Sequence, residues 1–379
     1  MSAAPTAGPG AQPTRRRAAH ARRRRLHRRR WLAILAVATV AVVVVVAVTV
    51  AGGYGYARLR VGQVASVHLP GLVPAPPPGR PMNLLVVGSD TRQGLHRQDR
   101  GQFGAVEGQR ADVILLVHLV PASHRASILS ISRDLYVPVA GSGGRSKINA
   151  ALAGGPERLV ETTKSDFGIP VSHYLLVDFD GFRAVVDAIG GIRLDFSVPV
   201  RDDDNGHNNS GLLITTRGCR QLDGTQALAL ASSRYYQYRG ADGVWHADPG
   251  YDLGRIRRQQ VLLRALAAQA LRRGLANPLR ANAVVTAAAN HLTRDDTLTL
   301  GRAVRLAGQF RQLRPGALVG LTIPTVPALR GGEQVLVAVQ PATRQTVARF
   351  LGRSTPAAHL AVSAPTRTAG APAWDPRPC

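Results

Sequence analysis

The chain has 379 residues, 45% of them hydrophobic, which is enough to bury a sizeable core and excludes a chain that is disordered throughout. Its 48 Lys and Arg residues outnumber its 23 Asp and Glu residues, and the formal net charge is +25. Ten arginines and no acid lie in residues 1–30, so much of the charge is concentrated at the N-terminus. The two cysteines, Cys219 and Cys379, exclude a scaffold of several disulfides and a four-cysteine zinc site.

An apolar run follows the basic tract directly. Residues 31–51 are interrupted only by Thr39 and Thr49, and as a helix they would span about 30 Å, the thickness of a bilayer core. Because the arginines precede this run, we expect residues 1–30 to be a disordered cytoplasmic tail, 31–51 a transmembrane helix, and the rest an extracytoplasmic part held at the cell membrane. A cleaved signal peptide, or a twin-arginine export signal, is the alternative.

The basic tract itself has two interpretations. Short Arg-rich runs often bind nucleic acid. Beside a membrane span, the same charge sets the topology and attracts anionic lipid headgroups, at about 1 kcal/mol per residue. The folded part would lie on the far side of the membrane, so we expect membrane lipid as a partner and no nucleic acid.

The part of the chain after the apolar run divides by composition. Residues 52–81 are typical of a Pro-rich linker, 82–350 of a folded domain, and 351–379, rich in Pro, Ala and Thr, of a flexible tail. Within the domain, short apolar runs that predict strands alternate with stretches that predict helices. The predicted strands lie at 84–87, 113–120, 127–131, 174–177 and 192–200, and the predicted helices at 149–167, 182–189 and 255–273. This alternation favours a three-layer α-β-α domain with a central mixed sheet.

Two carboxylates flank the first two predicted strands. Asp90 follows the first strand, and Asp112 precedes the second. Ligands collect where the strands of an α/β sheet meet their loops, and oxygen ligands without a nearby His or Cys favour Mg²⁺ or Mn²⁺ over zinc. The pair therefore predicts a magnesium site, while a turn or cap role for each Asp is the alternative.

Charged residues also follow the third predicted strand. Arg133 carries a planar fork that matches a phosphate, and Asp134 is placed to tether a neighbouring Arg. A structural ion pair between the two is the alternative. Lys147 and Asn149 follow a Gly-rich loop at 141–144, which is either a phosphate cradle or a plain flexible loop.

The densest cluster of charges lies at the start of the helix predicted from Arg255. Arg255 and Gln259 are four residues apart and share a face of that helix. The positive end of the helix dipole favours an anion there, and Arg234 and Asp252 lie upstream. The alternative is an ordinary solvated helix face.

Taken together, these motifs resemble the LytR–CpsA–Psr family of cell-wall ligases, over residues 82–272. The segments that carry the resemblance are 83–92, 110–112, 130–134, 147–150, 179–191 and 222–259. The resemblance implies a membrane-anchored phosphotransferase. Such an enzyme moves an anionic glycopolymer from a polyprenyl-pyrophosphate carrier to peptidoglycan, through a phosphodiester to a muramic acid hydroxyl.

The resemblance also implies roles for individual residues. Asp90 and Asp112 fall where the family holds its magnesium, and the implied catalytic residues that grip the pyrophosphate are Arg133, Arg234 and Arg255. The implied substrate-binding residues are Arg92, Arg110, Asp134, Lys147, Asn149, Asp252, Arg258 and Gln259. The family commonly has Arg-x-Arg where this chain has Ser232-Ser233-Arg234, so one phosphate contact is missing or supplied elsewhere.

Other functions remain open at this level. A polyprenyl-pyrophosphate hydrolase would use the same residues with water as acceptor, and a non-enzymatic wall- or lipid-binding regulator is a different class. Four aromatics lie between Arg234 and Asp252, where they either stack on sugar rings or pack the loop: Tyr235, Tyr236, Tyr238 and Trp245.

The two cysteines lie outside the membrane in this topology, where thiols tend to oxidise. A tail that reaches across the surface allows a Cys219–Cys379 disulfide. Two free thiols, or a dimer linked through Cys379, are the alternatives.

Overall fold

The structure is a computed structural model. It describes residues 64–89, 110–270, 283, 284, 286, 287, 290–299, 301–303, 305, 318–353 and 372–379. The predicted basic tail and membrane helix lie outside these residues, and so do Asp90 and Arg92. Within the part of the chain that is described, no helix is both long enough and apolar enough to cross a bilayer.

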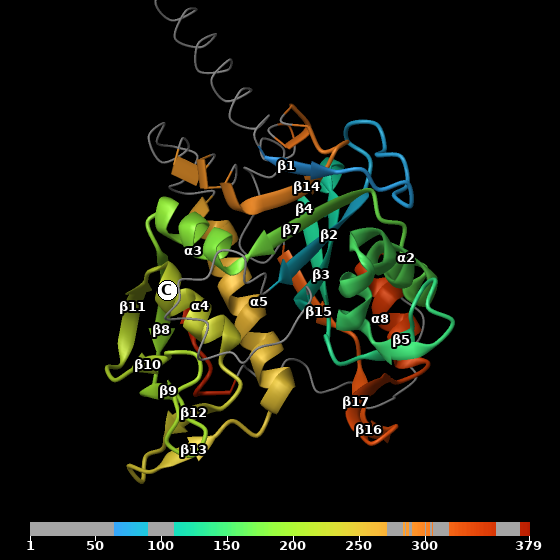
Figure 1. Cartoon of the computed structure of the whole chain (residues 1–379). Coiled ribbons are helices and arrows are strands. Elements are labelled where there is room, and N and C mark those ends of the chain that lie inside the picture. Colours follow the sequence, from blue (N-terminus) through green and yellow to red (C-terminus); the bar gives the residue numbers. More distant parts are fainter. Residues whose placement is uncertain are drawn as a thin grey trace, which may run out of the picture. The chain divides into compact units, whose positions relative to one another are not determined.

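A seven-stranded mixed sheet forms the centre of the fold (Figure 1). Its strands, in spatial order, are β1 (Ala65–Val67), β14 (Leu292–Asp295), β7 (His173–Asp178), β2 (Met82–Ser89), β3 (Ala111–Val120), β4 (Arg125–Ile131) and β15 (Leu318–Thr322). The pairs β1–β14, β2–β7 and β4–β15 are parallel, and the other neighbours are antiparallel. The prediction of a central mixed sheet is confirmed.

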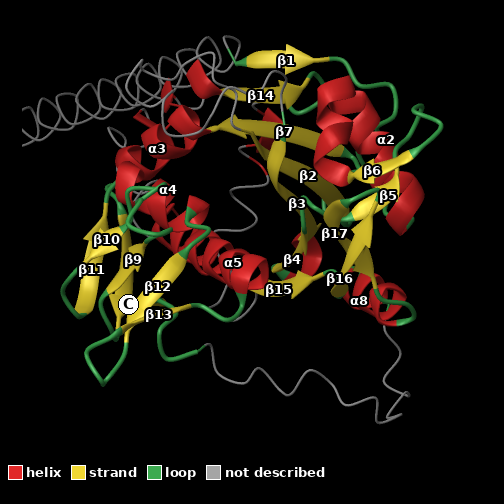
Figure 2. Cartoon of the chain, turned by 60° about the horizontal axis from the view of Figure 1, so that its bottom comes forward, coloured by secondary structure: helices red, strands yellow, loops and turns green. Residues whose placement is uncertain are grey.

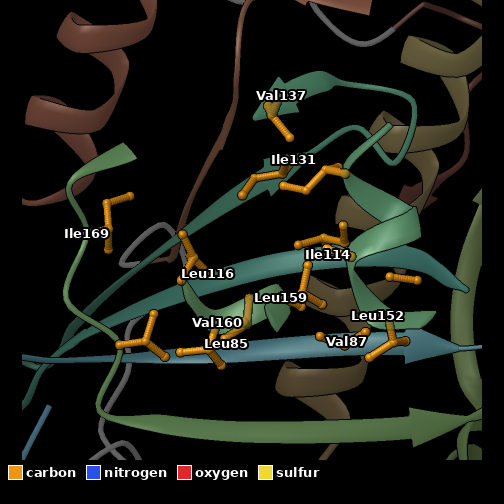
Figure 3. Packing of buried hydrophobic residues seen from close by; sticks show 14 of the residues in the cluster. Leu85, Val87, Ile114, Leu116, Ile131, Val137, Leu152, Leu159, Val160 and Ile169 are labelled. Carbon is orange, nitrogen blue, oxygen red and sulfur yellow. The ribbon is translucent and has the colours of Figure 1, made fainter. Parts of the chain in front are cut away.

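Helices lie on both sides of this sheet (Figure 2). On one side are α2 (Pro156–Phe167), α8 (Ala342–Phe350) and the 3-10 helix η4 (Ile148–Gly154); on the other are α3 (Phe179–Ala188), α4 (Gly224–Ser232) and α5 (Tyr251–Gln269). The main core lies under α2, where Leu85 and Val87 of β2 share one buried cluster with Leu159 and Val160 (Figure 3). Alternate residues of a strand point to one face, which is why the i, i+2 spacing of the β2 residues fills this core.

A second cluster of buried residues lies between α3, α4, α5 and two small sheets. These sheets are formed by β10 (Leu213–Ile214), β9 (Val200–Asp202), β12 (Tyr236–Arg239) and β13 (Trp245–Ala247), and by β11 (Gly218–Leu222), β8 (Ile192–Phe196) and β18 (Arg377–Pro378). The single strand predicted at 192–200 is therefore wrong. It is divided at residues 197–199 into β8 and β9, which belong to different sheets and not to the central one.

The remaining strands are short hairpins beside α2 and α8. They are β5 (Tyr136–Pro138) with β6 (Arg145–Lys147), and β16 (Thr325–Arg330) with β17 (Glu333–Ala338).

The sequence Leu222-Asp223-Gly224 fixes the start of α4. The Asp223 carboxylate accepts from the backbone N–H of Gln226 at 2.8 Å, and the Gln226 side chain accepts from the Asp223 N–H at 3.3 Å, which is a capping box. A Cβ on Gly224 would lie 2.4 Å from the backbone oxygen of Arg183 in α3. The capping box begins the helix, and the missing side chain lets α3 and α4 approach closely.

Both predicted unstructured flanks contribute to the fold. In the segment predicted as a linker, β1 is an edge strand of the central sheet and Leu69 is buried in the main core. In the segment predicted as a flexible tail, Asp375 is buried and Cys379 is bonded to Cys219 with their Cα atoms 6.0 Å apart. The Cys219–Cys379 prediction is confirmed, while the linker and tail predictions are wrong for the described residues 64–81 and 372–379. The amino-acid composition of these two segments showed that they are rich in proline, but it did not show the distant parts of the chain with which they pair.

Candidate functional site

A pocket of about 300 Å³ opens where β3 begins, where β4 and β7 end, and where α4, α5 and the loop after β9 approach the sheet. It is lined by Asp112, Val113, Arg133, Phe179, Asp202, Asp204, Asn209, Ser210, Leu228, Ala231, Ser232, Arg234, Tyr235, Arg255 and Gln259. Five residues predicted to be functional, from separate parts of the chain, therefore meet in one pocket. They are Asp112, Arg133, Arg234, Arg255 and Gln259.

Arg133 follows β4 and is held by two carboxylates. Its Nη1 donates to Asp112 Oδ1, and its Nε lies 3.5 Å from Asp134 Oδ2. Burial lowers the pKa of Arg133, but the charges of Asp112 and Asp134 outweigh burial and raise it. The guanidinium therefore stays fully charged in a half-buried place, and Asp134 contacts Arg133 without lining the pocket.

Arg255 is the most deeply buried arginine of the pocket, with 6% of its surface exposed. It pairs with Asp252, which also accepts from Ser132 Oγ at 3.0 Å. Burial lowers the pKa of Arg255, and the positive charges of Arg133 and Arg234 lower it further. Its Nε has no hydrogen-bond partner among the described residues. The charge of Asp252 opposes this lowering of the pKa, and the positive charges of Arg133 and Arg234 act on Arg255 across a space that a multiply charged anion would neutralise.

The segment between α4 and β12 supplies the open side of the pocket. Arg234 is exposed, and Gln259 donates from its side chain to the Ala231 carbonyl at 3.0 Å. Ser232 lines the pocket, but its hydroxyl donates back to the Leu228 carbonyl at 2.7 Å. Ser232 is therefore occupied within its own helix and does not replace a guanidinium.

Several predicted binding residues lie away from the pocket. Arg258 has an exposed fraction of 0%, pairs with Asp248 at 2.5 Å, and lies over the Tyr236 ring at 3.9 Å. Its predicted role in substrate binding is wrong, because both its charge and its flat face are used inside the fold. Lys147 pairs with Glu333 at 3.3 Å.

Two further predicted residues are also outside the pocket lining. Arg110 is exposed directly before β3. The backbone N–H of Asn149 donates to the Arg133 carbonyl at 3.1 Å, so Asn149 contacts the turn that carries Arg133. These contacts make Asn149 a support for the site, with no side-chain contact to the pocket.

The wall formed by the loop after β9 was not predicted from the sequence. Asp202 accepts from Ser233 Oγ at 3.0 Å and from the Tyr235 N–H at 2.8 Å, so it holds the backbone on both sides of Arg234. Asp204 also lines the pocket and accepts from the Asn205 amide at 3.3 Å. The acidic run 202–204 was a visible signal, but nothing in the sequence places it opposite Arg255.

The four aromatics of this region separate into two groups. Tyr235 lines the pocket and is 47% exposed, so its ring is available to a ligand. The other three pack within the fold: Tyr236 is buried, Tyr238 stacks on Trp374 at 4.4 Å, and Trp245 lies under Arg201 at 4.5 Å.

The donor set beside Asp112 suits a hard cation. Asp112 faces the pocket with one carboxylate oxygen paired to Arg133. Ser89, next to Asp112 across the paired ends of β2 and β3, has a buried hydroxyl with no partner among the described residues. Such oxygens fit Mg²⁺. Asp90 is not described, and the described residues hold no cluster of three or more His, Cys, Asp or Glu side chains.

The chain belongs to the LytR_cpsA_psr family, whose model matches residues 73–349. A probable cell wall biosynthesis protein, LcpB of Corynebacterium glutamicum, is 33% identical over 247 residues, which are 64% of this chain and 54% of that protein. The polyisoprenyl-teichoic acid–peptidoglycan teichoic acid transferase TagV of Bacillus subtilis is 38% identical over 168 residues, which are 43% of this chain and 40% of TagV. The chain thus matches about half the length of these relatives.

Solved structures share the fold. A LytR-Csp2A-Psr enzyme from Actinomyces oris superposes with a TM-score of 0.59 at 25% identity, covering 76% of this chain and 95% of that one. Bacillus subtilis TagV superposes with a TM-score of 0.55 at 23% identity, covering 73% of this chain and 99% of the TagV chain. The second likeness concerns the fold alone.

Proposed function

We propose that the chain is a membrane-anchored phosphotransferase that moves an anionic glycopolymer from a polyprenyl-pyrophosphate carrier to peptidoglycan through a phosphodiester. The observation that carries this proposal is the convergence of Arg133, Arg234 and Arg255 on one pocket beside Asp112. The name of the relative TagV, a polyisoprenyl-teichoic acid–peptidoglycan teichoic acid transferase, supports this chemistry, and that of LcpB, a probable cell wall biosynthesis protein, supports a role in the cell wall.

The arrangement suits a diphosphate substrate. Phosphoryl transfer depends mainly on positioning and on stabilising charge at the phosphorus and the leaving group. Arg133 and Arg255 are fixed by Asp112 and Asp252, so their remaining N–H groups are preorganised to donate to phosphate oxygens. Arg234 is exposed and lines the pocket, so it would contact the substrate from the open side.

In the proposed step, a muramic acid hydroxyl oxygen bonds to the phosphorus that carries the glycan. The bond from that phosphorus to the bridging oxygen breaks, and polyprenyl phosphate leaves with the electron pair. The hydroxyl proton passes to Asp204, a pocket carboxylate for which no ion pair with a described basic residue is found. Asp202 is unsuited to this role because it already accepts from Ser233 and Tyr235.

Asp112 together with Asp90 would hold Mg²⁺, with Mn²⁺ as the substitute. The bound ion would neutralise developing negative charge on the diphosphate. The Ser89 hydroxyl has no partner among the described residues, and only Oδ1 of Asp112 is bonded to Arg133; both facts support this assignment.

The proposal is tested with the full chain in detergent, given lipid-linked glycan, peptidoglycan and Mg²⁺. Covalent attachment of glycan to peptidoglycan is expected, and it should be lost in Arg255→Gln and kept in Arg330→Gln, which changes an exposed β16 residue outside the pocket. Release of free glycan phosphate at the same rate without peptidoglycan would identify the hydrolase instead. Binding of lipid-linked glycan with no turnover would identify a non-enzymatic receptor.

The membrane placement is proposed from the order of charge and apolar residues at the N-terminus. With residues 31–51 as the span, a reporter fused after Arg353 should be active only if it functions outside the cytoplasm. Activity of a cytoplasm-only reporter at that position would contradict the topology.

A further inference from the structure

A second pocket, of about 280 Å³, lies at the opposite end of β2 and β7. It is lined by residues 75–79, Met82, His173, Arg302 and Arg305. Met82 and His173 begin their strands, whereas Ser89 and Asp178, at the far ends, lead to the first pocket. His173 and Asp178 are five residue steps apart along β7, about 17 Å at the usual rise, so the two pockets are distinct sites.

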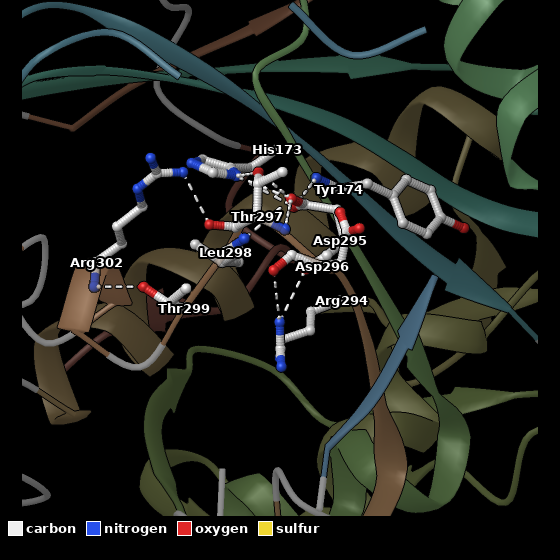
Figure 4. Close-up of polar contacts among 9 residues, drawn as sticks. All are labelled: His173, Tyr174, Arg294, Asp295, Asp296, Thr297, Leu298, Thr299 and Arg302. Carbon is white, nitrogen blue, oxygen red and sulfur yellow. Dashed lines mark hydrogen bonds and ion pairs between the residues drawn. The ribbon is translucent and has the colours of Figure 1, made fainter. Parts of the chain in front are cut away.

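A buried imidazole–carboxylate pair lies at this pocket, which is lined by its histidine, His173 (Figure 4). His173 is 1% exposed and Asp295 is 0% exposed, and His173 Nδ1 lies 3.1 Å from Asp295 Oδ2. Asp295 also accepts from the backbone N–H groups of Tyr174, Thr297 and Leu298, each at 3.0 Å. Burial alone would raise the pKa of Asp295, but the hydrogen bonds from His173 and Thr297 outweigh it and lower the pKa.

The ionised carboxylate fixes the tautomer of the imidazole. An acceptor-only Asp295 requires Nδ1 of His173 to carry the hydrogen, which leaves Nε2 as the second functional atom. Nε2 is buried and has no hydrogen-bond partner among the described residues. Buried side-chain polar atoms usually have a hydrogen-bond partner, so Nε2, which has none among the described residues, is the atom of this pair open to a ligand.

The rest of the pocket determines which ligand fits. Arg302 donates from Nη1 to the Thr297 carbonyl at 2.8 Å, so the turn that pairs with His173 also holds this guanidinium (Figure 4). Arg305 adds a second positive charge, and Pro76, Pro77, Pro78 and Met82 supply apolar walls. Two guanidiniums favour an anionic ligand, and Nε2 favours a ligand with which it can share a proton.

We propose that this pocket binds a phosphomonoester, with His173 Nε2 sharing a proton with one phosphate oxygen and Arg302 and Arg305 neutralising the others. The second ionisation of a phosphomonoester lies at about pH 6, so near neutral pH this anion can bring a proton to share with Nε2. A carboxylate, a sulfate or a phosphodiester carries no such proton at neutral pH. The phosphate group that binds here belongs either to free phosphate or to a lipid headgroup.

The test is calorimetric titration of the full chain in detergent with three water-soluble ligands. They are inorganic phosphate, dihexanoyl phosphatidic acid, which is a monoester, and dihexanoyl phosphatidylglycerol, which is a diester. Two classes of site are expected, one in each pocket. Arg234→Gln should weaken only the first class, so failure of the proposed phosphotransferase function and failure of this second site are separable.

His173→Asn is the critical variant, since the Asn amide can still donate to Asp295 while Nε2 is removed. We expect it, and Arg302→Gln, to weaken the second class at least tenfold, and Arg330→Gln to leave both classes unchanged. Tighter binding of phosphatidic acid than of inorganic phosphate would identify a lipid headgroup, and equal binding would identify the free anion. Unchanged binding in Arg302→Gln or in a folded His173→Asn, or equal binding of the diester and the monoester, would overturn the proposal.

Discussion

Arg133 and Asp112 form an ion pair between the end of β4 and the start of β3, although 21 residues separate them in the sequence. The two strands are antiparallel neighbours, which brings the end of one to the beginning of the other. A predicted metal ligand and a predicted phosphate-binding group are therefore in direct contact. A change at Asp112 should affect both the cation and the arginine.

Asp112→Asn should abolish transfer. The amide removes a charged oxygen from the proposed magnesium site and weakens the fixation of Arg133, and loss of one such preorganised group costs about 10²–10³ in rate. Turnover at a series of Mg²⁺ concentrations measures the effect, with Asp242→Asn, in the exposed turn before β13, as the control. Full activity of Asp112→Asn in excess chelator would count against the metal site.

Arg133→Lys and Arg255→Lys should each lose about tenfold or more in kcat/KM, because an ammonium cannot replace two parallel guanidinium N–H groups. Arg239→Lys is the matched control, since Arg239 lies at the exposed end of β12 outside the pocket. Steady-state kinetics with lipid-linked glycan provide the measurement. Wild-type rates in both pocket variants would show that these arginines do not contact the substrate.

Asp204→Asn should lower kcat much more than it raises KM, because the carboxylate is proposed to act on the attacking hydroxyl and not on the diphosphate. Asp203→Asn, next in the chain and outside the pocket lining, controls for a change in loop charge. A change confined to KM would exclude Asp204 as the proton acceptor.

Asp166→Asn should stabilise the protein above neutral pH. Burial raises the pKa of Asp166 to about 6, and Oδ2 of this residue has no partner among the described atoms. The pKa of an unfolded-state Asp is about 4, whereas that of Asp166 in the folded protein is about 6. Because the folded-state pKa is the higher one, the free energy of unfolding falls as the pH rises from about 4 through about 6. The gain in Tm should therefore be present at pH 8 and vanish near pH 4.

The sign of this effect can be checked against Asp242, where hydrogen bonds with the Val244 backbone and His246 lower the pKa. Asp242→Asn should be neutral at low pH and lower the Tm at pH 8. If the change in Tm had the same dependence on pH in both variants, the opposite pKa shifts given for Asp166 and Asp242 would be contradicted.

Cys379→Ser should lower the free energy of unfolding. The disulfide closes a loop of 160 residues, for which the chain-entropy model gives about 4–5 kcal/mol. It also holds Asp375 against Arg257, at 2.8 Å. Denaturant unfolding of Cys379→Ser, Cys219→Ser and the double variant should give three equal losses, and additive losses would indicate that the two cysteines act independently.

The sequence by itself predicted five of the residues that line the pocket and most of the strands around them. Apolar runs with strand-like length predicted β2, β3, β4 and β7, because a buried strand must present apolar side chains wherever it lies. The types of charged side chain at their ends indicated a phosphate and cation site. The two cysteines had one intramolecular pairing available, and that pairing is present.

Tertiary structure alone decided which charges face the pocket. Arg255 and Arg258 are three residues apart on α5, and helical periodicity places them on neighbouring faces. Arg255 lines the pocket, whereas Arg258 is buried between Asp248 and Asp375, the latter in the C-terminal segment. Local sequence fixes the direction of a side chain on its own helix. Whether that direction leads to a ligand or to a buried carboxylate depends on segments that reach it only when the chain folds.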